Sequence, residues 1–542
     1  MGATKTIVEV DNFCYGQDAD TIIENILQSR GIQDTYAFMN PDELFIEPPE
    51  AIPFMDQACK IVKDALDNNK RIFLNVDSDT DGVTSGTIVK RYLEHCWDTE
   101  VHWHISKGKT HGTSDELTAK LIADNPDVLI IVDSLDSTLW NYKKYKEMGI
   151  EVVVLDHHDI NPKIPYDSVI TLASSNRSSN KQLSGAGVCW KFCKRLDRMT
   201  GNDFADELSD LAAAGIVADM MDLSEKTMEN RAIVNLGLRH LNNPAMKKII
   251  GGFPYNSQSV SYSIAPLINA CCRYNKNETA FKAFISDNTE EIKREIKIMK
   301  NCRDVQRNEV DSILENLRSQ LQDQDHESVL VGMIETVNGI NGLIANKIAH
   351  ETNKPTLILK TSFDNDGNPI YSGSGRSTDE RNFRKICEES GLGRAYGHPN
   401  AFGVFVNEDD LEAFITAIRE EYQKEESLQC LSVDAMIAPE DITLDLIDKV
   451  KELNAISGTG FPQIQFVVKI CDWIADTMTQ GKHLVLKDGI FTYIQWNTGS
   501  QVEHYDDLSL EDAPLTVVGT LDSGFFGRRF VPRLIINQIV ED

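Results

Sequence analysis

The stretch RIFLNVDSDTDG, residues 71–82, joins a short apolar run to three aspartates at alternate positions. Two other apolar runs end in the same way: VLIIV is followed by Asp133, and EVVVL by the triplet Asp156-His157-His158. Runs of this length, rich in Val, Ile and Leu and separated by helix-compatible segments, are typical of buried parallel strands. Because ligands bind such sheets outside the carboxyl ends of the strands, we expect the three acidic clusters to converge on one edge.

The side chains in these clusters predict a metal site. Carboxylates with one or two histidines and no cysteine suit Mg²⁺, Mn²⁺ or Fe²⁺ better than a structural zinc ion. Closely spaced carboxylates repel one another unless cations neutralise them, and two ions roughly 3.5–4 Å apart can clamp a phosphodiester during its hydrolysis. The alternative, an ordinary loop or helix-cap role, is favoured for any single aspartate but not for three clusters in register. The sequence therefore predicts a hydrolytic metal centre.

Length and composition indicate a multidomain globular protein. A chain of 542 residues has the length of roughly three to four domains, and 41% hydrophobic and 25% charged residues are ordinary values. No apolar run approaches the roughly 18–20 residues of a transmembrane helix, and the first residues lack the apolar segment of a signal peptide. The 11 cysteines form no CxxC pair, which favours reduced core thiols. We therefore expect a cytoplasmic protein without a membrane partner.

The formal net charge of −30 argues against nucleic acid as a partner, because phosphate binding depends on Lys and Arg. Whole-chain charge is a blunt measure, however, since a cleft can be locally basic while the outer surface is acidic. Many of the acids lie in surface-like stretches such as NEDDLE and EEYQKEE. Bound metal ions would also cancel several charges, so the acidity lowers the expectation of nucleic-acid binding without excluding it.

Alternating strand-like and helix-like segments predict an α/β fold with five regions. Residues 1–50 form an N-terminal extension, and 51–277 are predicted to form a doubly wound domain around a parallel sheet. The charged stretch 278–328 predicts one or two connecting helices, and 329–428 a second, smaller α/β domain. Short strand-like pieces with polar turns across 429–542 predict a small all-β barrel.

Three glycine-containing segments predict anion binding. LSGAG places Ser184, Gly185 and Gly187 before an amphipathic helix, which leaves backbone N–H groups free for an anion. Later in the chain, YSGSGRS and GLGRAYGHPNAFG combine glycines with Arg376 and His398. Glycines let the backbone approach an anion closely while these side chains supply positive charge.

Taken together, these segments resemble the DHH phosphoesterase family and, within it, the RecJ-type single-strand-specific exonucleases. VDSDTDG is similar to the family's DxDxDG motif, and VLDHHD contains the Asp-His-His that gives the family its name. Further segments are similar to other motifs of the family and occur in the same order: LSGAGVCWKF, AAAGIVADMMDL, IAPLINACCR, GSGRS, GHPNAFG, SGTGFPQIQF and GKHLVLK. The last two resemble the start of the oligonucleotide-binding (OB) fold of RecJ. The resemblance covers residues from about 73 to 540, with departures at Leu135, Cys272, Tyr396 and Phe402.

The resemblance implies a site that activates water with two divalent cations, Mn²⁺ or Mg²⁺. The implied metal ligands are Asp77, Asp79, Asp81, Asp133, His157 and Asp219. The implied catalytic residues are Asp81, Asp133, His157 and His158. Within this set, His158 would assist by hydrogen bonding or proton transfer, and Asp156 would orient its neighbours without touching an ion.

The resemblance also implies nucleic-acid contacts outside this centre. The implied substrate and phosphate contacts are Ser184, Gly185, Gly187, Arg273, Ser374, Arg376, Ser377, Gly397 and His398. An OB-like barrel offers a groove and stacking aromatics for several nucleotides of a single strand. Its candidate DNA contacts are Phe525, Phe526, Arg528 and Arg529.

These expectations combine into a metal-dependent phosphodiesterase that hydrolyses single-stranded DNA from the 5′ end, in DNA repair or recombination. The resemblance implies a single-strand-binding protein as a partner. We expect a monomer, and the acidic surface suits a phage or mobile-element version of the enzyme. Two alternatives stay open: a DHH phosphodiesterase for short oligonucleotides or cyclic dinucleotides, and a non-catalytic nucleic-acid-binding scaffold. The C-terminal β region argues against the first, and the complete set of acidic positions against the second.

Overall fold

The computed structural model describes residues 6–108, 111–336, 339–363, 367–378, 381–423, 429–509, 514–526 and 529–541. The chain divides into two compact units. The larger unit contains residues 6–272, 277–296 and 430–542, and the smaller is formed mainly by residues 297–429.

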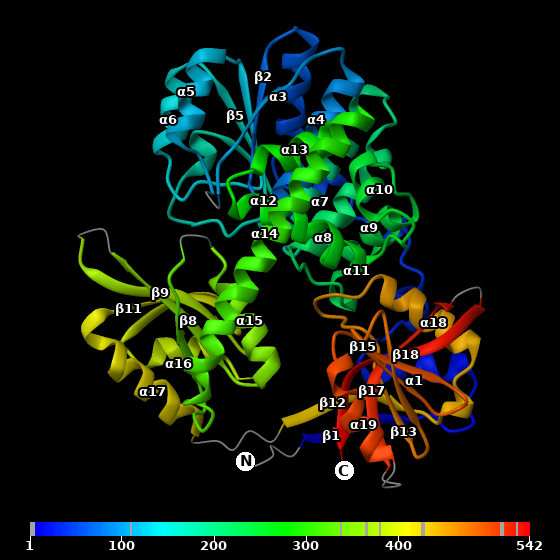
Figure 1. The fold of residues 1–542 in the computed structure, drawn as a ribbon. Helices are drawn as coiled ribbons and strands as arrows, with labels where there is room; N and C mark the ends of the chain where they lie inside the picture. The colour runs from blue at the N-terminus through cyan, green and yellow to red at the C-terminus, as the bar shows by residue number, and fades with distance from the viewer. Residues whose placement is uncertain are drawn as a thin grey trace. The chain divides into compact units, whose positions relative to one another are not determined.

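A five-stranded parallel sheet lies in the larger unit (Figure 1). Its strand order is β3 (His102–Ile105), β2 (Ile72–Val76), β4 (Val128–Val132), β5 (Glu151–Asp156) and β6 (Thr171–Ser174). Every neighbouring pair of these strands runs parallel. The expected α/β fold with a parallel sheet is therefore confirmed, and the three acidic clusters belong to three adjacent strands.

Helices cover both faces of this sheet. On one face, α5 (Asp115–Asp124) and α6 (Trp140–Glu147) bury a cluster of apolar side chains against the strands. The other face is covered by α3 (Met55–Asp67), α4 (Thr80–Cys96) and α7 (Gly185–Thr200), as Figure 1 shows. Burial on both faces explains why β4 and the interior of β5 are apolar throughout instead of alternating.

A second, eight-stranded sheet belongs to the same unit. Its strand order is β1 (Thr6–Phe13), β12 (Gln429–Met436), β13 (Phe466–Ile470), β17 (Leu515–Phe526), β18 (Arg529–Glu541), β16 (Thr492–Gln495), β15 (His483–Lys487) and β14 (Ile474–Met478). The strands expected in residues 429–542 are therefore present. Among the described residues no ladder joins the outer strands β1 and β14, so the sheet is open and closure into a barrel is not seen.

The N-terminal residues are part of this second sheet. β1 is the neighbour of β12, and Nδ2 of Asn12 donates to the carbonyl of Asp434, 422 residues away in the chain, at 2.9 Å. Helix α1 (Ala19–Ser29) packs with α18 (Leu444–Ala455) and buries its apolar face in the core that they share with the sheet. The region that we described as an N-terminal extension thus completes a structure formed by the C-terminal part of the chain.

The smaller unit contains a five-stranded mixed sheet. Its order is β10 (Gly393–His398), β11 (Ala401–Asn407), β9 (Pro369–Arg376), β8 (Thr356–Phe363) and β7 (Leu330–Met333). In the described ranges, β7 and β8 run parallel and the other pairs antiparallel.

Helices pack on both faces of this mixed sheet. One face is covered by α16 (Phe383–Glu389) and α17 (Leu411–Gln423), and the other by α15 (Asn341–Thr352) with the C-terminal part of α14 (Thr289–Gln322). Helix α14 is a continuous helix of 34 residues, where we expected one or two connecting helices. Within the described part of the chain, no helix is long and apolar enough to cross a membrane.

Candidate metal centre

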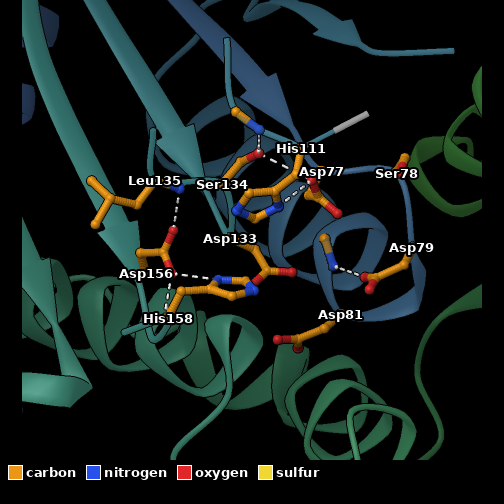
Figure 2. A network of polar contacts seen from close by, with 12 residues as sticks. Asp77, Ser78, Asp79, Asp81, His111, Asp133, Ser134, Leu135, Asp156 and His158 are labelled. Carbon is orange, nitrogen blue, oxygen red and sulfur yellow. Dashed lines mark hydrogen bonds and ion pairs between the residues drawn. The ribbon is translucent and has the colours of Figure 1, made fainter. Parts of the chain in front are cut away.

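The acidic clusters meet at the carboxyl edge of the parallel sheet. Asp77 follows β2, Asp133 follows β4, and Asp156 is the last residue of β5. Since these strands are neighbours in register, their acidic residues lie close together, as Figure 2 shows. Three groups have ligand atoms within 4.8 Å of one another: the Asp79 group (Asp77, Asp79, Asp133), the Asp219 group (Asp81, His157, Asp219) and the His158 group (Asp133, His157, His158). All six expected metal ligands belong to at least one of these groups.

Two helices begin at the centre and fix the position of Asp81. Asp79 is the N-cap of α4 and accepts a hydrogen bond from the backbone N–H of Gly82 at 3.1 Å, which places Asp81 in the first turn. The Asp81 carboxylate accepts from the N–H groups of Gly185 at 2.7 Å and Ala186 at 3.0 Å, at the start of α7. Helix N-termini bind anions through such N–H groups and the helix dipole. The anion bound at the start of α7 is therefore the Asp81 side chain.

The N–H groups of the LSGAG segment where we expected an external anion already have partners within the protein. Ser184 is the N-cap of α7, and its hydroxyl accepts from the N–H of Gly187 at 3.3 Å. The N–H of Gly185 donates to Asp81, as described above. The N–H groups that we expected to be free for an external anion are thus already bonded, and direct substrate contact by these three residues stays a prediction.

Two glycines permit the close packing around the carboxylates. A Cβ atom added at Gly185 would lie 2.7 Å from Oδ1 of Asp133. One added at Gly215, in α8 (Ser209–Ala218), would lie 2.3 Å from Oδ1 of Asp81. Any larger side chain at either position would have to displace a carboxylate. Gly215 is therefore needed for α8 to approach the acidic residues.

Asp133 is held in an uncommon backbone conformation. Its φ is 56°, in the left-handed region that costs free energy for a residue other than glycine. Its side chain is buried, and its Oδ1 atom has no hydrogen-bond donor among the described residues. That oxygen lies 3.2 Å from Nε2 of His157, which in turn lies 3.4 Å from Oδ2 of Asp219. A buried carboxylate oxygen without a donor, close to two other ligand atoms, is suited to binding a cation.

Asp156 orients both histidines of the DHH triplet. Its Oδ1 accepts from the backbone N–H groups of His157 at 2.5 Å and His158 at 2.7 Å, and it lies 2.8 Å from Nδ1 of His158. Burial disfavours a charged ring, but the hydrogen bond and charge of Asp156 outweigh it and raise the pKa of His158 to about 9. Burial would raise the pKa of Asp156, yet the same contacts lower that pKa to about 2. The contact with Asp156 therefore favours the doubly protonated form of the His158 ring.

Burial and mutual repulsion raise the pKa values of the carboxylates. Burial is the main cause at Asp79, whose pKa rises to about 6, and the charges of Asp77 and Asp81 add to it. Burial and the charge of Asp81 also raise the pKa of Asp219 to about 8. The pKa of Asp133 lies well above its ordinary value for the same two reasons. Cations bound among these groups would favour their ionised forms.

One residue of the centre was not anticipated from the sequence. Nδ1 of His111 lies 3.1 Å from Oδ1 of Asp77, and its ring packs edge-on against His158 with 4.5 Å between the ring centroids (Figure 2). The same Asp77 oxygen accepts a hydrogen bond from Oγ of Ser134 at 3.0 Å. The segment HGTS matches none of the motifs that we used. The available signal was the position of His111 after β3, the strand next to β2.

The donor set fits hard divalent cations. Carboxylate oxygens predominate, and two or three imidazoles accompany them, a combination that suits Mg²⁺ or Mn²⁺ better than a thiolate-rich zinc site. The unpartnered Oδ1 of Asp133 and the raised pKa of Asp219 are two separate signs of this fit. In both cases the protein alone supplies too few donors or positive charges to stabilise the ionised carboxylate.

In the smaller unit, two of the predicted phosphate contacts lie in one row of the sheet. His398 is the register partner of Ala401, and Ala401 is the register partner of Arg376. The guanidinium of Arg376 approaches the start of α15, where a Cβ atom added at Gly342 would lie 2.6 Å from its Nη2. Burial and the charge of Arg273 lower the pKa of Arg376. Two arginines and a helix N-terminus thus concentrate positive potential in this part of the unit.

Three other predicted contacts lie near this row. Ser374 is two residues before Arg376 on β9, and Ser377 directly follows that strand. Gly397 on β10 has a φ of 129°, a conformation that strongly favours glycine. These positions agree with a backbone that turns sharply beside the arginine, and their contact with substrate stays a prediction.

The predicted DNA contacts of the C-terminal region lie at the β17–β18 hairpin. The register pairs Phe525 with Phe530 and Phe526 with Arg529. Arg528 lies outside the described residues, and the structure describes only the backbone of Phe525, Phe526 and Arg529. Their contact with DNA therefore stays a prediction as well.

A family model fits the part of the chain that forms the parallel sheet. The model named DHH family, N-terminal domain, matches residues 71–216, from β2 into α8. We refer to this segment as the DHH domain, after the family model that it matches. It contains five of the six expected ligands, and the sixth, Asp219, lies three residues beyond the matched range.

Relatives extend the likeness beyond the DHH domain. YorK, an SPbeta prophage-derived protein of Bacillus subtilis (strain 168) provisionally named a single-strand DNA-specific exonuclease, is 28% identical over 434 residues, 74% of each chain. The single-stranded-DNA-specific exonuclease RecJ of Thermus thermophilus is 24% identical over 470 residues, 84% of this chain and 68% of that one. The resemblance to RecJ-type DHH proteins is therefore confirmed.

A solved structure has the same fold. The crystal structure of Thermus thermophilus RecJ in complex with Mn²⁺ superposes with a TM-score of 0.75 at 20% sequence identity. The match covers 100% of this chain and 80% of that one. The DHH domain, the smaller unit and the eight-stranded sheet thus all have counterparts in a RecJ structure.

Proposed function

We propose that this chain is a metal-dependent exonuclease that hydrolyses single-stranded DNA from the 5′ end. The observation that carries the proposal is the convergence of six expected ligands into groups whose ligand atoms lie within 4.8 Å of one another. The names of YorK and RecJ, which match over most of the chain, support the choice of single-stranded DNA as substrate.

Two divalent cations, Mn²⁺ or Mg²⁺, are the proposed cofactors. The Asp79 group would hold one ion and the Asp219 group the other, with Asp133 and Asp81 near both. When bound, such ions lower the pKa of water and neutralise charge on the phosphate. RecJ of Thermus thermophilus has been crystallised with Mn²⁺ and with Mg²⁺, which supports the same choice of metals.

The side chains of the protein then have separate tasks. His158, kept protonated by Asp156, would donate a hydrogen bond or a proton to the reacting phosphate group. The N–H groups of Gly185 and Ala186 hold both oxygens of Asp81 in place, so this carboxylate needs no reorganisation when a substrate binds.

Other parts of the chain would bind the strand. Arg376, His398 and Arg273 are the proposed phosphate contacts in the smaller unit, with Ser374 and Ser377 beside them. The C-terminal sheet is proposed to act as an OB-like module for several nucleotides. We further propose that the protein is a cytoplasmic monomer. It would work in DNA repair or recombination together with a single-strand-binding protein.

A time course with defined substrates tests the proposal. Purified protein with Mn²⁺ is incubated with a 3′-labelled single-stranded DNA, its duplex, a 5′-blocked strand, a dinucleotide and a cyclic dinucleotide. Asp81→Asn, which keeps the shape of the side chain and removes its charge, is the control. Progressive shortening of the unblocked single strand, absent in the variant, is the expected result.

Other outcomes would redirect the assignment. Cleavage confined to the dinucleotides would transfer the function to small-substrate turnover. Cleavage of the 5′-blocked strand at the normal rate would overturn the 5′ polarity. No reaction with any substrate, by a protein that still binds single-stranded DNA, would favour a non-catalytic scaffold.

A further inference from the structure

Asp219 lies at a strained helix end. It is the C-cap of α8, and its N–H donates to the carbonyl of Gly215 at 2.9 Å. The next residue, Met220, has a φ of 55° although it is not glycine, and its side chain is exposed. The left-handed conformation costs such a residue free energy and persists only when the surrounding structure imposes it. The N–H groups of Met220 and Met221 donate to the carbonyls of Val217 at 3.2 Å and Ile216 at 3.1 Å, so the end of α8 closes this turn itself. Contacts made after Met221 then fix the direction in which the chain leaves the turn that presents Asp219.

Asp222 is the first fixed point after this turn. Its Oδ1 accepts from the N–H of Ser224 at 3.0 Å, and its Oδ2 from the hydroxyl of Ser224 at 2.9 Å. Its carbonyl accepts from Oγ1 of Thr227 at 2.7 Å and from Nδ2 of Asn230 at 3.0 Å. With both ends of the residue bonded, neither the side chain nor the backbone of Asp222 can shift without breaking several hydrogen bonds.

A loop of the C-terminal region packs against this fixed point. The loop, residues 457–461 (SGTGF), lies in the same compact unit as the DHH domain. The N–H of Leu223 donates to the carbonyl of Thr459 at 2.8 Å. Gly460 has a φ of 76°, and a Cβ atom added there would lie 1.9 Å from Oδ1 of Asp222. A Cβ at Gly458 would lie 2.9 Å from Cδ1 of Leu223.

A buried arginine holds the loop in place. Nη1 of Arg231 donates to the carbonyl of Ile456 at 3.0 Å, directly before the loop, and its Nε donates to the carbonyl of Phe38 at 3.0 Å. The guanidinium also lies over two rings, 3.8 Å from the centroid of Phe38 and 4.9 Å from that of Phe461. Cation–π contacts of this kind are strongest where water is excluded, and Arg231 is only 1% exposed.

We propose that residues 457–461 are a positioning element for Asp219: the loop fixes Asp222 and Leu223, and these residues anchor the chain that leaves the turn, which keeps the Asp219 carboxylate directed at the metal centre. The inference rests on the proposed function, because it assigns Asp219 to an ion. It adds that the C-terminal region, besides contacting DNA, maintains the geometry of one half of that centre.

Calorimetric titration of the full-length protein with Mn²⁺, without DNA, tests this role. In Gly460→Ala the added methyl group meets Asp222, and we expect about 10- to 100-fold weaker binding of one of two ions, with the other unchanged. Gly489→Ala is the matched control, because Gly489 has a similar φ of 84° in the same C-terminal region but no atom within 4 Å of an added Cβ. It should bind both ions as the wild type does.

Activity measurements separate positioning from simple loss of folded protein. For Gly460→Ala, the Mn²⁺ concentration that gives half-maximal DNA hydrolysis should rise, while kcat at saturating Mn²⁺ recovers. Partial unfolding would instead lower kcat and leave the half-maximal concentration unchanged. If Gly460→Ala does not fold, Ser224→Ala, which removes one hydrogen bond to Asp222, should give a smaller shift in the same direction.

The outcomes distinguish this inference from the proposed function. Wild-type protein that binds two Mn²⁺ ions, with unchanged binding in Gly460→Ala and Ser224→Ala, would overturn the positioning role and leave the proposed function intact. Wild-type protein that binds no Mn²⁺ would overturn the metal-dependent function itself. Equal weakening by Gly489→Ala would also refute the role of the loop.

Discussion

Oδ2 of Asp81 accepts a hydrogen bond from the backbone N–H of Gly185 at 2.7 Å, so one helix of the DHH domain begins at a carboxylate carried by another. Burial raises the pKa of Asp81, while His157 and the N–H groups at the start of α7 oppose that effect. The N–H groups at the start of α7 therefore favour the ionised form of Asp81, which burial disfavours.

Replacement of Gly185 by alanine should disrupt the centre without unfolding the protein. The new methyl group would lie 2.7 Å from Oδ1 of Asp133, so that carboxylate must move. We expect at least about a tenfold loss of Mn²⁺ affinity and of DNA hydrolysis, measured by calorimetry and by product release. Gly201→Ala, at the other end of α7, is the control: its φ is 80° but an added Cβ meets no atom within 4 Å. That variant should lose roughly 1–2 kcal/mol of stability and keep its Mn²⁺ affinity.

Asp133→Asn should be inactive and yet more stable than the wild type when metal is removed. The substitution deletes a buried charge whose pKa is already raised by burial and by Asp81. Asparagine also tolerates the left-handed φ of 56° at this position. In EDTA, we expect the free energy of unfolding to rise by roughly 1 kcal/mol in chemical denaturation. A less stable variant would show that the aspartate is not a source of strain in the metal-free protein.

His111→Ala should weaken the centre from outside the predicted ligand set. The variant removes the contact at 3.1 Å with Oδ1 of Asp77, and partners of this kind typically contribute about 10- to 100-fold to affinity or rate. Rates measured across a Mn²⁺ series would reveal the loss. His102→Ala removes a histidine from β3 that pairs with Asp124, away from the centre, and should behave as the wild type. Equal rates for both variants would exclude a role for His111.

The metal-free protein should become less stable as the pH rises from 5 to 8. The raised pKa values of Asp79, about 6, and Asp219, about 8, mean that the folded protein binds protons that the unfolded chain releases above about pH 4. This stabilisation is complete at low pH and is lost as the pH passes through the folded-state values. Thermal unfolding in EDTA at several pH values measures the slope, and saturating Mn²⁺ should remove the part that comes from Asp79 and Asp219.

Asp219→Asn isolates the upper part of this pH dependence. Without the group that titrates near pH 8, the change in Tm between pH 6 and pH 8 should become smaller, while the change below pH 6 persists. A wild-type Tm in EDTA that increases steadily over the same range would contradict the assignment of raised pKa values to this cluster.

The convergence of the acidic clusters could be predicted because it depends on local pattern alone. Apolar runs of five or six residues that end in aspartate specify parallel strands, and the carboxyl ends of such strands share an edge. The position of Asp156 at the end of β5 follows from the same rule. Asp219 does not follow from this rule, because it lies at the end of a helix and not of a strand, and its place in the expected ligand set came from the family resemblance.

Other parts of the centre depend on contacts that no local pattern contains. The N–H groups of the LSGAG segment were expected to be free, because nothing in the segment reveals that Asp81, about 100 residues earlier, binds them. His111 follows a strand without any motif, so its approach to Asp77 emerges only from the three-dimensional arrangement. The pairing of β1 with β12 is of the same kind.

That pairing has a consequence for how the chain acquires its structure. Every strand of the parallel sheet lies within residues 72–174, so the DHH domain can assemble from neighbouring segments early in synthesis. β1 and α1 are made long before β12 and α18 but must wait for them, because they have no other described partner for their strand edge and apolar face. A segment that is synthesised before the DHH domain is thus among the last to fold, and its exposed strand edge is where misassembly during synthesis would begin.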